Sequence, residues 1–213
     1  MATKSNPSAD RLGPMVEEAV ARLEGVVTRT PLQRNERLSE LVGGEVWLKR
    51  EDLQPVRSYK LRGAYNLMAQ LDDAGRGVVC ASAGNHAQGV AYACAALRIK
   101  GRIYLPRTTP RQKRERIAAI GGPWIEIVIE GETYDDAVAV AEAAAAKSDA
   151  VVVPAFDDLQ TIAGQGTIAV EIIEQLGREP DLMVVPVGGG GLLAGVAGWL
   201  GEEHPAVEVH GVE

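Results

Sequence analysis

Lys60 is the residue of this chain whose position most directly suggests covalent chemistry. It lies in the segment Ser-Tyr-Lys-Leu-Arg-Gly-Ala, where Ser58 resembles a helix N-cap and residues 59–71 have a helical pattern. A cation in the first turn of a helix opposes the helix dipole, which lowers the pKa of its amine. An amine with a lowered pKa is a nucleophile that can form imines. Most lysines at helix starts are solvated, however, so this position alone does not identify a catalytic residue.

A second segment, Ser82-Ala83-Gly84-Asn85-His86, predicts an anion site of the size of a carboxylate. It lies between a predicted strand at 77–81 and a predicted helix at 86–97. Small residues let the backbone approach a ligand, and the N–H groups at a helix start attract an anion. Ser82 and Asn85 are also good capping residues, so a capped strand–helix turn without a ligand stays open as an alternative.

Four consecutive glycines separate a buried apolar strand predicted at 182–187 from a helix predicted at 192–200; they are Gly188, Gly189, Gly190 and Gly191. The backbone N–H groups of such a loop can all point at one anion. Ordering four glycines carries an entropy cost that a turn without a ligand would avoid with fewer of them. The loop therefore predicts phosphate binding.

The glycine loop does not by itself say which phosphate binds. Gly189, Gly191 and Ala194 fit the loose dinucleotide pattern G-x-G-x-x-A, and Glu213 ends the next predicted strand about 20 residues on. The dinucleotide fingerprint normally marks the first strand–helix unit of its domain, whereas several units precede this loop. An NAD-like site is therefore an alternative that leaves the other two segments unexplained.

These three segments occupy turns in a chain of alternating helices and strands. Helices are predicted at 11–24, 59–71, 86–97, 110–120, 135–147, 159–176 and 192–200, and strands at 45–50, 77–81, 102–105, 124–129, 150–154, 182–187 and 207–212. The alternation predicts an α/β fold with open, mostly parallel sheets, in which ligands bind beyond the carboxyl ends of the strands. We expect a smaller domain at 53–147, and a larger, incomplete domain at 1–52 and 148–213 that carries the phosphate loop.

Composition narrows the functional class. The net charge of −7 argues against nucleic acid as a partner. No apolar run reaches the roughly 20 residues that a membrane span needs, and the polar residues 1–10 resemble a frayed tail rather than a secretory signal. Cys80 and Cys94 lack metal-ligand or redox spacing, so both are predicted to be buried thiols. A reducing compartment, the cytoplasm, is the expected location.

Together the three segments resemble one family, the fold-type II pyridoxal-phosphate (PLP) enzymes, whose domains are tryptophan-synthase-β-like. Within it they resemble the threonine dehydratase (threonine ammonia-lyase) and serine racemase branch. The resembling sequences are SYKLRGAYN around Lys60, SAGNHAQGVA from Ser82, AGQGT from Ala163 and VPVGGGGLLAG from Val184. The resemblance extends from about Arg29 to Glu213, and the order and spacing of the motifs agree as well.

The resemblance implies a role for each matching residue. Lys60 would hold PLP as a Schiff base and later move protons at the substrate Cα, next to Tyr59, which stands where the family usually has Phe. Asn85 would hydrogen-bond the ring oxygen of the cofactor. The substrate carboxylate would bind to the loop formed by Ser82, Gly84, Asn85 and His86. The cofactor phosphate would bind to Gly188, Gly189, Gly190, Gly191 and Leu192.

The implied reaction is elimination of water from L-threonine or L-serine, which yields 2-oxobutanoate or pyruvate and ammonia. Racemisation needs a proton donor on the face opposite Lys60, and the racemase branch looks to place a Ser just before the Gly-Asn-His. The residue here is Ala83, whose methyl group cannot carry that proton. Dehydration is therefore favoured, with serine racemisation as the alternative.

The resemblance also implies more chain than is present. The family's larger domain continues past the strand at 207–212, with a group that faces the pyridine nitrogen. Glu213 matches a position where relatives place a cation-binding carboxylate, but the chain alone predicts no metal site. We expect a fragment of an active enzyme, and a complete but non-catalytic or partner-dependent binding module is the alternative. By family analogy, the full-length enzyme would be a homo-oligomer that acts on a small amino acid.

Overall fold

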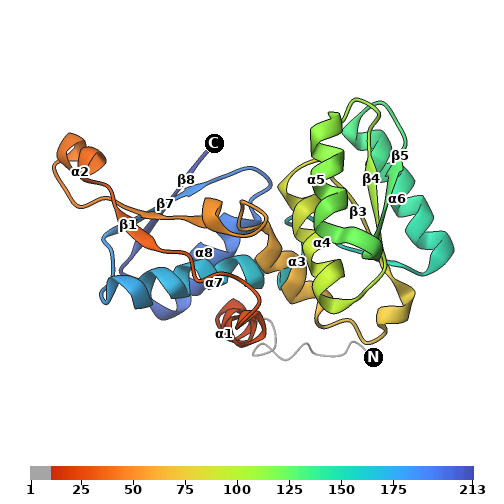
Figure 1. Cartoon of the computed structure of the whole chain (residues 1–213). Helices are drawn as coiled ribbons and strands as arrows, with labels where there is room; N and C mark the ends of the chain where they lie inside the picture. Colours follow the sequence, from red (N-terminus) through yellow and green to blue (C-terminus); the bar gives the residue numbers. More distant parts are fainter. Residues whose placement is uncertain (1–10) are drawn as a thin grey trace.

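A computed structural model describes residues 11–213, so the frayed tail predicted at 1–10 lies outside the described residues. Two groups of elements, each built on its own parallel strands, lie side by side (Figure 1). The helix α3 (Lys60–Met68) lies between them and packs against helices of both groups. This α/β architecture confirms the predicted fold class.

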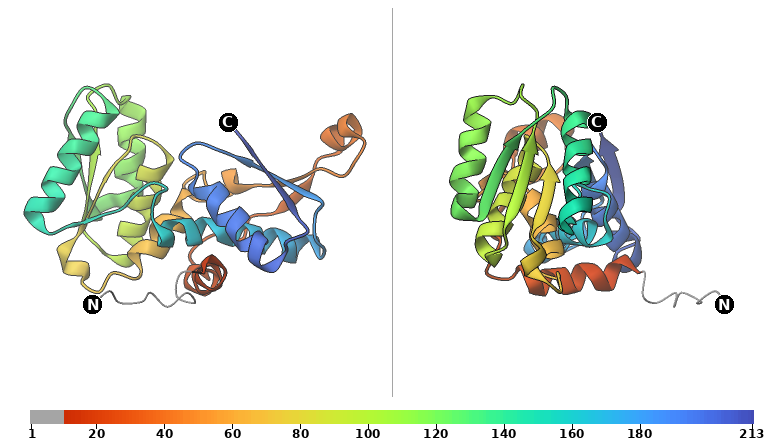
Figure 2. Two further views of the ribbon diagram at one scale, coloured as in Figure 1. Left: turned by 180° about the vertical axis from the view of Figure 1, so that it is seen from behind. Right: turned by 90° about the vertical axis from the view of Figure 1, so that its right-hand side faces the viewer.

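The first group is a parallel sheet with the strand order β5–β4–β3–β6. Its strands are β3 (Val78–Ala81), β4 (Gly101–Leu105), β5 (Ile125–Ile129) and β6 (Val151–Val152). The helices α4 (Asn85–Leu97) and α5 (Arg111–Gly121) pack on one face, and α6 (Tyr134–Ser148) packs on the other (Figure 2). Because β3 and β6 are parallel neighbours, the loops that follow them meet at one edge of the sheet.

The second group packs three helices against a parallel strand pair. Its elements are α1 (Leu12–Leu23), α7 (Leu159–Leu176), β7 (Leu182–Pro186), α8 (Gly191–Glu203) and β8 (Glu208–Val212). The bounds of α7 agree with the predicted helix because local signals set both ends. Asp158 accepts hydrogen bonds from the N–H groups of Gln160 and Thr161, and Gly177 ends the helix in the left-handed conformation.

An antiparallel strand pair near the N-terminus was not predicted as such. It consists of β1 (Leu32–Arg34) and β2 (Trp47–Lys49), which are joined through α2 (Glu36–Val42). The helix α2 begins at Asn35, whose side chain accepts a hydrogen bond from the N–H of Leu38, and it ends at Gly43 with positive φ. In Figure 1 this helix stands away from the rest of the fold.

Some predicted boundaries are wrong near the key lysine. Ser58 does not cap a helix, because α3 begins at Lys60 and Tyr59 holds the cap position with a helical backbone. The hydroxyl of Ser58 is instead buried without a hydrogen-bond partner among the described residues. The predicted helix also runs past the observed end at Met68. Short 3-10 turns occupy η1 (Glu51–Leu53), η2 (Ala74–Arg76) and η3 (Gly122–Trp124).

The prediction for the two cysteines is confirmed, since Cys80 and Cys94 are both buried and unpaired. They face the apolar layer between the first sheet and the helices α4 and α5. Within residues 11–213, none of the helices combines the length and apolar character that a bilayer crossing requires.

Candidate active site

Lys60 is the first residue of α3, and its side chain is half-buried. Its Nζ donates a hydrogen bond to the carbonyl oxygen of Ala155 at 2.7 Å and lies 5.3 Å from the centre of the Tyr59 ring. Burial lowers the pKa of the Lys60 amine. The lowered pKa was expected from the helix dipole, whereas desolvation is the cause in the structure. Either way, a larger share of the amine is neutral and nucleophilic than for a solvated lysine.

The backbone of Lys60 is held in place by a close approach of α4. A Cβ built on Gly89 would lie 2.9 Å from both the carbonyl carbon and oxygen of Lys60. Any larger side chain at this position would push α3 away from α4. The absence of a side chain at Gly89 therefore sets where the lysine enters the site.

A buried ionic network fixes the same helix from the other side. Arg62 is fully buried and donates to both carboxylate oxygens of Glu51 at 2.8 and 2.9 Å and to Glu171 at 2.7 Å. It also donates to the hydroxyl of Thr167 at 3.1 Å. Lys49 forms a second ion pair with Glu171, so two cations balance two carboxylates. The network ties α3 to α7 and to the segment after β2, two residues beyond Lys60.

The loop that follows β3 brings an open helix start to the site. Ser82 accepts a hydrogen bond from the N–H of Gly84 at 3.2 Å, and α4 begins at Asn85, whose side chain is exposed. Gly84 holds the N-cap position, and no side chain of residues 11–213 caps the first turn of α4. The alternative of an ordinary capped turn therefore does not describe this loop. Its free N–H groups can receive an anion.

The ring of His86 lies inside the protein. Its Nε2 is 2.8 Å from the carbonyl oxygen of Val153, and its buried Nδ1 has no partner among the described residues. Burial lowers the pKa of His86, the contact with the Val153 carbonyl raises it in part, and the nearby charge of Lys60 lowers it, with a net pKa of about 4. The ring is therefore neutral at neutral pH and offers no positive charge to a carboxylate, whereas its backbone N–H lies in the open first turn of α4.

The glycine loop forms the turn from β7 into α8. Gly190 has φ of +86°, a conformation that strongly favours glycine, and the start of α8 has no side-chain cap within the part of the chain that the structure describes. A Cβ on Gly189 would lie 2.2 Å from the ring of Phe156, and a Cβ on Gly191 would lie 2.9 Å from its backbone. A Cβ built on Gly188 or Gly190 would meet no atom of the described residues within 4 Å. This open loop, which leads into a helix start without a side-chain cap among residues 11–213, fits a phosphate.

The site residues therefore meet around one connection, the residues between β6 and α7. Lys60, His86 and the glycine loop each contact it, through Ala155, Val153 and Phe156 respectively. None of these three connecting residues was predicted as part of the site. Their contacts use backbone carbonyls and one ring, which leave no local sequence signal.

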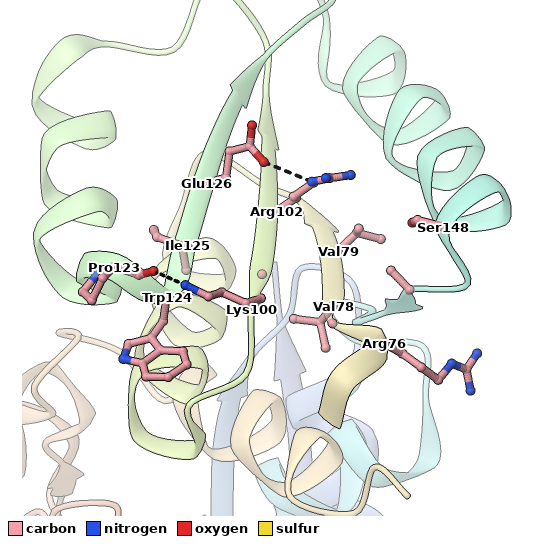
Figure 3. A pocket seen from close by; sticks show the side chains of 13 residues that line it. Arg76, Val78, Val79, Lys100, Arg102, Pro123, Trp124, Ile125, Glu126 and Ser148 are labelled. Atoms are coloured by element: carbon pink, nitrogen blue, oxygen red, sulfur yellow. Dashed lines mark hydrogen bonds and ion pairs between the residues drawn. The ribbon is translucent and has the colours of Figure 1, made fainter. Parts of the chain in front are cut away.

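A cavity of about 350 Å³ lies elsewhere, at the amino ends of β3, β4 and β5 (Figure 3). Its charged side chains already have partners, since Lys100 donates to the carbonyl of Pro123 at 2.8 Å and Arg102 to Glu126 at 3.0 Å. It contains none of the predicted site residues. Because parallel sheets bind ligands at the opposite, carboxyl ends of their strands, we do not place the site there.

The motifs resemble those of PLP-dependent enzymes, and comparison with known proteins agrees. The chain belongs to the pyridoxal-phosphate dependent enzyme family, whose model matches residues 23–213. This membership confirms the predicted cofactor and favours it over the dinucleotide that the glycine pattern had left open.

Individual relatives confirm the resemblance to the threonine dehydratase and serine racemase branch. The chain is 56% identical over 211 residues to biosynthetic L-threonine dehydratase IlvA of Mycobacterium tuberculosis, a match that covers 98% of this chain and 49% of the relative. Processed threonine deaminase isoform 2 of Solanum lycopersicum superposes with a TM-score of 0.90 at 40% identity, covering 100% of this chain and 58% of that one. Maize serine racemase superposes with a TM-score of 0.89 at 33% identity, covering 94% of this chain and 60% of that one. The chain thus spans about half the length of the curated relatives it matches.

Proposed function

We propose that this chain carries the cofactor and substrate sites of a PLP-dependent L-threonine ammonia-lyase, which converts L-threonine to 2-oxobutanoate and ammonia. L-Serine would give pyruvate and ammonia. The observation that carries the proposal is the position of the half-buried Lys60 amine, which shares one connecting segment with two uncapped helix starts. The 56% identity to a threonine dehydratase supports threonine as the substrate.

Each part of the site would have a separate task. Bound PLP would supply an electron sink for the negative charge that develops at the substrate Cα. Lys60 would hold the cofactor covalently and then take the proton from Cα, for which its lowered pKa is suited. The amide of Asn85 would donate to the cofactor ring oxygen. The phosphate would bind the N–H groups of Gly188, Gly189, Gly190, Gly191 and Leu192.

The open start of α4 would orient the substrate through its carboxylate. The hydroxyl of Ser82 and the backbone N–H groups of Asn85 and His86 are the donors we assign to this task. Gly84 would contribute by holding the hydroxyl of Ser82 through its own N–H. The buried ring of His86 would act differently, because its Nε2 already contacts Val153 and holds the loop against the segment after β6. A fixed carboxylate leaves the Cα–H bond in one orientation toward Lys60.

Serine racemisation is the second candidate, since maize serine racemase shares the fold at 33% identity. A racemase needs a proton donor on the face of Cα that Lys60 does not reach. Ala83 offers only a methyl group at the position where a Ser would provide it. We therefore expect no D-serine from the unmodified chain, and Ala83→Ser should raise its formation. Unchanged D-serine formation in that variant would remove this argument.

Three further properties complete the proposal. Residues 53–147 would form the smaller domain, and 1–52 with 148–213 would belong to the larger one, although β6 just beyond this boundary pairs with β3. The longer enzyme would be a cytoplasmic homo-oligomer, as the family analogy suggests. Its substrate would be a small amino acid, with no nucleic acid or membrane as partner.

The test is formation of 2-oxobutanoate from L-threonine in the presence of PLP. It is best run on this chain and on a fusion of residues 1–213 to the remaining C-terminal part of the Mycobacterium tuberculosis relative, with Lys60→Ala as the control. Product that depends on Lys60 in either protein supports the proposal. A folded, PLP-loaded fusion that forms no 2-oxobutanoate would contradict it.

A further inference from the structure

The short connection from Val153 to Phe156 lies between β6 and α7 and contacts all three motifs of the site. The carbonyl of Val153 meets the ring of His86 at 2.8 Å, and the carbonyl of Ala155 accepts from Lys60 at 2.7 Å. Phe156 packs against the glycine loop. The substrate loop, the lysine and the phosphate loop are therefore all located relative to four consecutive residues.

This connection is itself anchored at both ends. The N–H of Val153 donates to the carbonyl of Val79 in β3 at 2.9 Å, which continues the pairing of β6. At the other end, Asp158 caps α7 with hydrogen bonds of 2.8 and 3.0 Å to two backbone N–H groups. A segment that is fixed at both ends can hold the groups that pack against it in defined positions.

Phe156 is the only phenylalanine of the chain, and its ring is not used for core packing. It is 40% exposed and belongs to none of the three apolar cores of residues 11–213. Its ring lies so close to Gly189 that a Cβ there would be 2.2 to 2.5 Å from three ring carbons. Its Cα and carbonyl oxygen likewise lie against Gly191. Both the ring and the backbone of Phe156 therefore contact the glycine loop.

The glycine loop has few means of holding its own shape. Its residues lack side chains, Gly190 has positive φ, and no side chain caps α8. Glycine loses more conformational freedom on ordering than any other residue, so a free loop of this kind would pay for its order when the phosphate binds. A ring packed against it lowers that cost in advance.

We propose that Phe156 is a positioning residue that holds the glycine loop in the arrangement needed for the cofactor phosphate. The inference rests on the proposed assignment of this loop and of Lys60 to the cofactor. It deepens that assignment by naming a side chain outside all the motifs that controls phosphate binding. Since the ring acts through the loop, its removal should affect a ligand that carries a phosphate and leave one that lacks it unaffected.

The experiment compares PLP with pyridoxal, which has the same aldehyde but no phosphate. Both are titrated against the unmodified chain and the variants Phe156→Ala, Phe156→Leu and Leu159→Ala, and the Lys60 peptide is quantified by mass after borohydride reduction. Leu159 is the matched control, because it is an apolar residue of the same region that is 51% exposed. Far-ultraviolet circular dichroism shows that each variant is folded.

We expect Phe156→Ala to raise the concentration of PLP needed for half-labelling of Lys60 by about tenfold, while labelling by pyridoxal stays within about twofold. Phe156→Leu should fall between the unmodified chain and Phe156→Ala, and Leu159→Ala should match the unmodified chain. If Phe156→Ala does not fold, the Leu variant decides by the same comparison. The inference is overturned if Phe156→Ala weakens labelling by PLP and by pyridoxal equally, or if it does not weaken labelling by PLP. Failure of the unmodified chain to label Lys60 with PLP instead contradicts the proposed function.

Discussion

Gly89→Ala should test whether the close approach of α4 to Lys60 determines the position of the lysine. Gly89 lies inside α4, and a Cβ there would be 2.9 Å from the carbonyl carbon and oxygen of Lys60 and 3.0 Å from the nitrogen of Leu61. All three are backbone atoms, so no flexible side chain can move aside. Since ordinary contact begins at 3.4 Å, the two helices must separate by about half an ångström.

Two opposing effects set the magnitude. Alanine is favoured over glycine in a helix interior by about 1 kcal/mol. Overpacking of a well-packed contact costs about 1–3 kcal/mol. We therefore expect Gly89→Ala to lower the free energy of unfolding by up to about 2 kcal/mol.

Gly201→Ala is the matched control, because Gly201 lies in α8 with no atom within 4 Å of a built Cβ. The free energy of unfolding of Gly201→Ala should rise by about 1 kcal/mol from helix propensity alone. Urea denaturation of both variants without cofactor gives the difference, which isolates the cost of the contact. Labelling of Lys60 by PLP should slow in Gly89→Ala and stay unchanged in Gly201→Ala. If Gly89→Ala is as stable as Gly201→Ala and its Lys60 is labelled at the normal rate, the contact does not determine the position of the lysine.

Three further outcomes follow from buried polar groups. Arg62→Met should lower the free energy of unfolding, measured in urea, by about 3–5 kcal/mol, because it leaves Glu51 without its cation and Glu171 with Lys49 alone. Arg102→Met in an exposed pair should cost at most about 1 kcal/mol, and similar losses for the two variants would contradict the buried network. The pKa of the His86 ring is about 4 in the fold and about 6.5 in the unfolded chain, so between these pH values only the unfolded chain takes up the proton. The free energy of unfolding should therefore fall by roughly 3 kcal/mol as the pH falls from about 6.5 to about 4. The variant His86→Gln should not show this fall in stability. If its stability depends on pH in the same way as that of the unmodified chain, the buried neutral ring is not the cause. Burial raises the pKa of Cys94 to about 12 and that of Cys80 further, so neither thiol should react with a disulfide reagent at pH 8 until urea unfolds the chain, and rapid native labelling would contradict the fold.

The helices with strong local signals could be predicted from the sequence. The bounds of α7 were predicted because Asp158 and Gly177 mark its ends and its apolar period is regular between them. The helix α2 was missed although Asn35 and Gly43 mark its ends in the same way, because it spans only two turns. Near Lys60 the capping signal was misleading. Ser58 is a good capping residue by type, but it is buried and lies one residue before the actual N-cap position at Tyr59.

The motifs of the site could be predicted, and the contacts between them could not. The glycine loop and the loop after β3 each show their character in a few consecutive residues. The contact of Phe156 with Gly189 depends on chain segments that meet only in the fold, and the lysine acceptor is a backbone carbonyl that any residue could offer. The role of the His86 ring was likewise out of reach, since its burial depends on the position of Val153.

The most direct test of the central claim is peptide mass mapping after borohydride reduction of the chain incubated with PLP. We predict one dominant pyridoxyl group on the Lys60 peptide, because burial lowers the pKa of this amine and the proposed phosphate loop contacts the same connecting segment as Lys60. A label that is absent, or spread over exposed lysines without preference for Lys60, would contradict the assignment of Lys60 as the cofactor lysine of this chain.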